Sequence, residues 1–259
     1  MALPNMQDSV FLQHLPTDIS FGMIHVEGGA FDMGETNEDA HNWEKPLHRV
    51  RVSAFFIGRT PVTQRLWKAV AGQQGNPQAF PGDQRPVENV SWDDITNIFL
   101  PELNRLSAGA RPENMTYRLP TEAEWEFAAR GGAAGEDFVY AGSDDLDAVG
   151  WYEANSNGET RPVQEKKPNA LGLYDLSGNV CERCLDRFDE LYFQQCLEHG
   201  IVTDPAGPDR FMNYALRAAR GGNFYHDARR CRIRYRGSAP ERAVSGVGFR
   251  LVLSGIAPV

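Results

Sequence analysis

The chain of 259 residues has few cysteines. The four that it has, Cys181, Cys184, Cys196 and Cys231, are too few and too irregularly spaced for a disulfide framework. Cys181 and Cys184 form a C-x-x-C pair, but no second ligand pair with the spacing of a structural zinc site accompanies it. We therefore expect free thiols in a reducing compartment.

The sequence also lacks a long apolar run. No stretch approaches the roughly 18 residues that a membrane-spanning helix needs, which predicts a protein without a membrane span. The first residues carry Asp8 and Asp18, where a secretory signal would have a basic end and an apolar centre. We therefore expect a cytoplasmic protein. Surface display through a partner, or through a signal outside this sequence, stays open.

Charge is unevenly placed along the chain. The formal net charge is −9, yet residues 217–250 hold nine arginines, no lysine and two acids, so this segment is +7 and the rest is −16. A basic stripe can indicate nucleic-acid binding. Here the arginines alternate with small and aromatic residues, and the acidic remainder would repel a phosphate backbone. We expect no nucleic-acid partner and expect the arginines to pair with the chain's own carboxylates.

Local patterns predict several short elements in the first half of the chain. Residues 23–34 are typical of two short strands around a glycine turn, and the alternation over residues 49–56 predicts one half-buried strand. Thr63 is placed to cap a short helix. A second helix should begin at Ser91 and be kinked or divided by Pro101.

A capping box marks a third helix. The Thr121 hydroxyl is expected to accept a hydrogen bond from the Glu124 amide, while the Glu124 carboxylate reaches back to the cap amide. After Gly132 helical periodicity disappears, and we expect loops and short strands to the end. Few helices, all early, followed by a long irregular half predict an α+β domain.

Several motifs together resemble one known family. Residues 118–132 read RLPTEAEWEFAARGG, which closely resembles the signature of the formylglycine-generating enzyme family, also called the sulfatase-modifying factor family. Its other landmarks occur in order: FDMG at Phe31, PVTQRLW at Pro61, PVENVSW at Pro86, NALGLYDLSGNV at Asn169, RGGNF at Arg220 and GFRLV at Gly248. The resemblance implies a loop-rich, C-type-lectin-like fold over residues 22–259, after an N-terminal extension of residues 1–21.

The resemblance also implies what catalysis would need. Active members of the family place two cysteines after the RGG motif, bind copper with them and oxidise a substrate cysteine to formylglycine. Two soft thiolates suit Cu(I). Here the second position is Cys231, but the first is His226, so we expect neither a copper site nor this activity. An oxidoreductase of the same family, with a remodelled Cys/His metal site, is the alternative.

A non-catalytic use of the fold fits the C-terminal segment better. Variable proteins of diversity-generating retroelements are similar to this family and end in a comparable stretch. Adenine-directed mutagenesis of that stretch never produces Lys, Glu, Gln, Met or Trp. Between Asn223 and Gly246 only Glu241 belongs to that set, where ordinary composition gives about four or five. This favours a ligand-binding protein whose partner is an unidentified protein or other surface ligand.

Two kinds of side chain alternate in this segment. Tyrosine and arginine provide large contact areas and directional hydrogen bonds, as they do in antibody loops. The candidate ligand-binding residues are Tyr225, His226, Asp227, Arg230, Tyr235, Gly237, Ser238 and Ala239. For Arg232, Arg234 and Arg236 we expect instead a buried ladder of salt bridges.

The resemblance further implies a calcium site in the loop that reads GNVCER here, where the family reads GNVWEW. The matching positions are Asp175, Gly178, Val180 and Glu182. Two carboxylates and two main-chain oxygens are hard ligands of the kind that calcium prefers. The alternative is that both carboxylates only accept hydrogen bonds within the protein.

Overall fold

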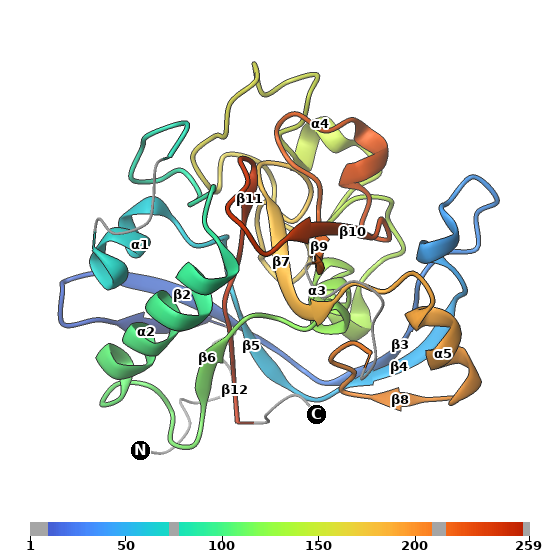
Figure 1. Cartoon of the computed structure of the whole chain (residues 1–259), viewed down its shortest axis with the longest axis horizontal. Coiled ribbons are helices and arrows are strands. Elements are labelled where there is room, and N and C mark those ends of the chain that lie inside the picture. Colours follow the sequence, from blue (N-terminus) through green and yellow to red (C-terminus); the bar gives the residue numbers. More distant parts are fainter. Residues whose placement is uncertain (1–9, 73–77, 209–215, 256–259) are drawn as a thin grey trace.

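The computed structural model describes residues 10–72, 78–208 and 216–255, whose strands form three sheets (Figure 1). The largest has the strand order β1 (Val10–His14), β2 (Ser20–Val26), β5 (Phe55–Gly58), β12 (Val252–Ser254) and β6 (Thr116–Arg118). The second has the order β10 (Gly237–Pro240), β9 (Leu216–Arg220), β7 (Cys181–Arg187) and β11 (Val247–Gly248). The third has the order β3 (Gly29–Met33), β4 (His48–Val52) and β8 (Val202–Thr203).

Short helices connect and cover these sheets. The α-helices are α1 (Gln64–Ala71), α2 (Leu100–Ser107), α3 (Glu122–Ala129), α4 (Leu146–Val149) and α5 (Tyr192–Glu198). Single turns are η1 (Asn42–Glu44), the π-helical η2 (Asp94–Phe99), η3 (Gly132–Ala134) and η4 (Ala228–Cys231). This mixture confirms the α+β class. The prediction that all helices lie early is wrong, because α4 and α5 follow Gly132 and are too short to show a clear helical period.

Helices α1 and α2 cover the five-stranded sheet, beside β2 and β6 in Figure 1. Thr63 caps α1 as predicted, since its hydroxyl accepts a hydrogen bond from the Leu66 amide. Pro101 lies in the first turn of α2, directly after the π-helical η2 ends, so the predicted division falls at this residue. Trp67 of α1 stacks on Phe99 of η2, with the ring centroids 5.1 Å apart.

Helix α3 is buried over its whole length and contacts β3, β4, β7 and β9. The predicted capping box is confirmed, with Thr121 and Glu124 exchanging both hydrogen bonds. A buried helix with three glutamates needs cationic partners, because an unpaired buried carboxylate is very costly. Arg118 is the cationic partner of Glu124, to which it donates two hydrogen bonds of 2.7 Å.

The structure differs from the sequence predictions at one strand and at the N-terminal extension. The strand expected over residues 49–56 is two strands, β4 and β5, which belong to different sheets. Its alternation is real, since β4 buries every second residue. Strand β1 pairs along its whole length with β2, so the sheet includes part of the predicted N-terminal extension. Residues 1–9 and 256–259 of the predicted segments lie outside the described residues.

Within the described ranges, no helix has both the length and the apolar character needed to cross a membrane.

Candidate functional site

Beneath the C-terminal segment lies a buried set of ion pairs centred on Glu122, the first residue of α3. Arg220 of β9 and Arg236 both donate to Glu122, and Arg220 also donates to Glu126 at 2.5 Å. All four side chains are at most 1% exposed. Burial opposes ionisation of Glu122, but Arg236 and Arg220 outweigh it and lower its pKa. Residues 220 and 236 of the segment are thereby fixed to α3.

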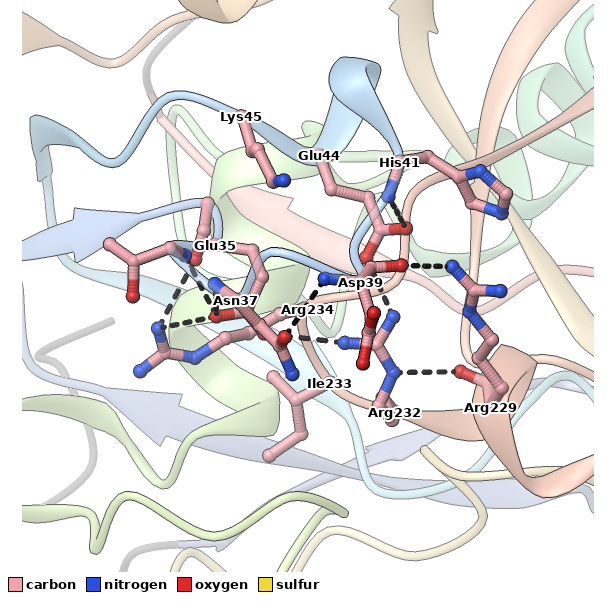
Figure 2. Close-up of polar contacts among 12 residues, drawn as sticks. Glu35, Asn37, Asp39, His41, Glu44, Lys45, Arg229, Arg232, Ile233 and Arg234 are labelled. Carbon is pink, nitrogen blue, oxygen red and sulfur yellow. Dashed lines mark hydrogen bonds and ion pairs between the residues drawn. The ribbon is translucent and has the colours of Figure 1, made fainter.

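A second set of ion pairs lies nearer the surface (Figure 2). Arg232 donates to Glu35 at 3.2 Å and to Glu44 at 2.8 Å. Arg234 pairs with Asp137 at 2.6 Å and lies 3.7 Å from Glu35. The predicted ladder of arginine salt bridges is therefore confirmed, although only Arg236 is wholly buried and the other two arginines are partly exposed.

The same contacts fix a loop from the N-terminal half against the segment. Figure 2 shows Glu35 to Lys45 lying alongside Arg229 to Arg234, with dashed contacts between the two stretches. Arg229 donates to the Asp39 carbonyl, and Arg232 donates back to the Arg229 carbonyl at 3.0 Å. The backbone under the candidate binding residues is thus held from two sides.

The candidate binding residues between these arginines lie mainly at the surface. Tyr225 is 45% exposed, and Asp227, Arg230 and Ser238 are also exposed. His226, Tyr235 and Gly237 are half-buried. Ala239 is an exception at 2% exposed, so its assignment to the binding surface is wrong. It lies on β10, where successive side chains face opposite sides, and it packs with Cys181 and Val247.

These residues also shape their own backbone. Asp227 caps η4, since its carboxylate accepts a hydrogen bond from the Arg230 amide at 3.1 Å. The Tyr225 hydroxyl donates to the Ser245 carbonyl at 3.1 Å, which holds the ring beside His226 with centroids 4.9 Å apart. The surface is therefore ordered before any ligand arrives.

A cavity of about 360 Å³ opens within this surface. Such a volume is at the small end of the range for ligand pockets. Its lining residues are Trp43, Cys181, Phe188, Glu190, Leu216, Gly222, His226, Arg230, Tyr235, Arg236, Gly237 and Ser238. Five of the eight candidate binding residues therefore meet at one cavity: His226, Arg230, Tyr235, Gly237 and Ser238.

His41 and Trp43, at the start of η1, also belong to this site and were not predicted from the sequence. Trp43 lines the cavity, and the His41 ring stacks on it at 4.3 Å and meets Tyr235 edge-on. Trp43 donates to the Arg236 carbonyl at 3.0 Å, and Arg236 donates to the Trp43 carbonyl at 2.9 Å. These partners lie 193 positions apart, and no local pattern in the sequence connects them.

The two remnant catalytic positions do not form a pair of thiolates. Cys231 is buried, and burial raises its pKa to about 12. Burial lowers the pKa of His226 to about 4, with Arg230 contributing, so the imidazole is neutral at pH 7. Its Nδ1 atom is buried without a hydrogen-bond partner among the described residues. One protonated thiol and one neutral imidazole do not fit the two-thiolate copper site of the active enzymes.

The predicted calcium ligands are occupied by other groups. Both Glu182 oxygens accept from Arg250, at 2.5 and 2.6 Å, and one also accepts from Trp125 at 2.7 Å. Asp175 accepts from the Gln164 amide and from Asn179, and burial raises its pKa to about 6. Gly178 and Val180 flank Asn179 in this loop. A calcium ion held at these four positions would have to displace Arg250 from the Glu182 carboxylate.

No group of three His, Cys, Asp or Glu side chains suited to a metal ion occurs in the part of the chain that the structure describes.

Known proteins similar to this chain share both its sequence motifs and its fold. The sulfatase-modifying factor enzyme 1-like domain matches residues 13–254. The chaperone protein LppX of Paenibacillus barcinonensis is 34% identical over 211 residues, 65% of this chain and 72% of that protein. The formylglycine-generating enzyme of Streptomyces coelicolor is 29% identical over 88% of each chain.

Among solved structures, the Treponema denticola variable protein 1 superposes with a TM-score of 0.80. It is 29% identical, and the match covers 94% of this chain and 98% of that one. The fold is therefore the C-type-lectin-like fold that the motifs predicted.

Proposed function

Because the chain belongs to the sulfatase-modifying factor enzyme 1-like family, we propose that it uses this family's fold as a non-catalytic scaffold for binding a ligand. In this proposal it is a variable protein of the kind that diversity-generating retroelements alter. Its ligand is a protein or another surface molecule, bound at the cavity beside Tyr235. The likeness to Treponema denticola variable protein 1 supports the assignment.

One observation carries the proposal: buried arginines hold the C-terminal segment from inside, while half of its candidate binding residues are exposed. Arg220 and Arg236 point inward and pair with buried glutamates of α3. Tyr225, Asp227, Arg230 and Ser238, four of the candidate binding residues, are exposed. A variable surface on a fixed support needs this division, because surface changes away from special contacts alter stability little.

The chemistry of the cavity also favours binding over catalysis. Tyrosine, tryptophan and arginine dominate the residues that carry most of the energy in protein interfaces. Tyr235, Trp43 and Arg230 all line the cavity. The buried, protonated thiol of Cys231 is by contrast a poor metal ligand or nucleophile.

Sequencing of the gene and its surroundings in many isolates tests the proposal. We expect a reverse-transcriptase gene close by and a near-copy of the last hundred or so bases that differs at adenines. Substitutions between isolates should concentrate at the codons for Tyr225, His226, Asp227, Tyr235 and Ser238, and spare Arg220 and Arg236. Substitutions spread evenly over exposed positions of the whole chain would contradict it.

A further inference from the structure

A second cavity, of about 420 Å³, lies between the outer strands of the five-stranded sheet and the start of α1. It is formed by β1, β2 and the turn after β5, whereas the cavity beside Tyr235 is formed around β10. In Figure 1, α1 and β2 lie on the left and β10 on the upper right, so the two cavities belong to different parts of the fold. We call this second cavity the Arg59 pocket.

The Arg59 pocket has a cation with an unused donor. The Nε atom of Arg59 is buried and has no hydrogen-bond partner. Its guanidinium lies over the Tyr174 ring at 5.2 Å, and the contact to the Tyr174 hydroxyl is long, at 3.5 Å. No carboxylate in the described ranges pairs with it. The Arg59 side chain as a whole is only half-buried and lines the cavity without a carboxylate partner, which favours a ligand that brings a negatively charged oxygen.

The other polar side chains of the Arg59 pocket include a second arginine and two glutamines that can donate hydrogen bonds. The Arg65 side chain forms no hydrogen bond or ion pair within the described part of the chain, and neither do the side-chain amides of Gln84 and Gln164, although all three residues line the pocket. Asp18 is the single acidic residue in the lining. The pocket therefore suits an anion better than a cation.

One wall of the Arg59 pocket is apolar. Val10 and Leu12 lie on the same face of β1 and are 41% and 50% exposed, which is unusual for such side chains beside a cavity. Ile19 and Phe21 of the neighbouring strand region, and Leu66 of α1, complete the apolar wall. A ligand that covered Val10 and Leu12 would remove this apolar surface from water.

From these observations we propose that the Arg59 pocket binds a monocarboxylate with an unbranched, medium-length apolar chain. The carboxylate accepts hydrogen bonds from Arg59, and the apolar chain lies along Val10 and Leu12. Planar guanidinium groups are suited to this role because they can donate two parallel hydrogen bonds to one carboxylate.

Titration calorimetry with octanoate tests the proposal, with octylamine as the matched probe of opposite charge. We expect saturable binding of octanoate and none of octylamine at the same concentrations. Arg59→Gln should weaken octanoate binding by about tenfold or more, since a hydrogen bond to a charged group is lost. Arg51→Gln, on the exposed side of β4, is the control and should bind as the parent does.

A second variant tests the pocket itself without altering its charge. A Cβ atom at Gly22 would meet Val10 at 3.6 Å and Arg59 at 3.7 Å, which are ordinary contacts. The Cβ of Gly22→Val is therefore accommodated, circular dichroism checks that the variant folds, and its side chain should weaken octanoate binding by narrowing the cavity. Equal binding of octanoate and octylamine, or unchanged octanoate binding by both Arg59→Gln and Gly22→Val, would overturn the proposal.

Discussion

Arg236 donates two hydrogen bonds, of 2.7 and 2.9 Å, to the carboxylate of Glu122, which lies 114 positions earlier in the chain. Both side chains are at most 1% exposed, and the Arg236 guanidinium also lies 4.0 Å from the Phe193 ring centroid. This pair fixes one end of the segment that carries the cavity beside Tyr235. We expect substitution of Arg236 to cause a large loss of stability.

The first prediction concerns that pair. Arg236→Ala should lower the free energy of unfolding by about 3–5 kcal/mol, because removal of one partner leaves a buried carboxylate under-compensated. Urea unfolding would measure this. Arg242→Ala, which removes an exposed arginine of the same segment, is the control and should change stability by no more than about 0.5 kcal/mol. Equal losses in the two variants would contradict the assignment of Arg236 as a structural residue.

The second prediction concerns the outward-facing residues. A combined variant with Tyr225→Ser, His226→Asn, Asp227→Asn and Tyr235→Ser should lose less than about 2 kcal/mol of unfolding free energy, since two of these side chains are exposed and two are only half-buried. Asparagine at 227 retains an oxygen that can cap η4. The same urea experiment gives the comparison with Arg236→Ala. A loss as large as that of Arg236→Ala would mean that these residues belong to the core.

The third prediction concerns catalysis. A sulfatase peptide with the substrate cysteine should remain unconverted after copper loading, because His226 stands where the active enzymes have a thiolate. Mass spectrometry of the peptide detects the aldehyde directly. His226→Cys tests whether one residue is sufficient to restore activity. Aldehyde formed by the parent protein over many turnovers would favour the oxidoreductase alternative.

The fourth prediction concerns calcium. Because Glu182 is paired with Arg250, millimolar calcium should leave the Tm unchanged relative to chelator. A ligand that binds only the native state would raise the Tm by mass action. A calcium-dependent rise that disappears in Asp175→Ala would show that the ion displaces these contacts, as the motif implied.

The fifth prediction concerns pH. Burial lowers the pKa of His226 to about 4 from 6.5, so below pH 6.5 the unfolded chain binds a proton that the folded protein does not. His226 therefore makes stability fall as the pH drops from 6.5 towards 4. His226→Asn should show a shallower fall in urea unfolding between these pH values. The exposed His199→Asn is the control, and an identical slope in the parent and His226→Asn would contradict the prediction.

Features that depend on neighbours in sequence could be predicted well. Thr121 and Glu124 form their capping box within one turn, so four residues are sufficient to predict it. The alternation of β4 likewise follows from the residues themselves. The split between β4 and β5 could not be predicted, because each strand is completed by a different sheet.

The candidate site was predicted only in part for the same reason. Tyr225 and Ser238 belong to a recognisable segment and are exposed as expected. Trp43 reaches the cavity from a distant turn, and Glu182 is occupied by Arg250 from the end of the chain. Contacts of that kind depend on how the loops meet in three dimensions, which local patterns do not encode. Ala239 shows the opposite error, because its position on β10, and not its residue type, decides that it is buried.

The arginine contacts at residues 232, 234 and 236 have a consequence for binding kinetics. The backbone that carries Tyr235 and Ser238 is held on both sides before a ligand arrives, so little ordering remains to be done on association. Replacing the outward side chains should then change the lifetime of a complex far more than the rate at which it forms. Variants of this surface would differ mainly in how long they retain a ligand once it has bound.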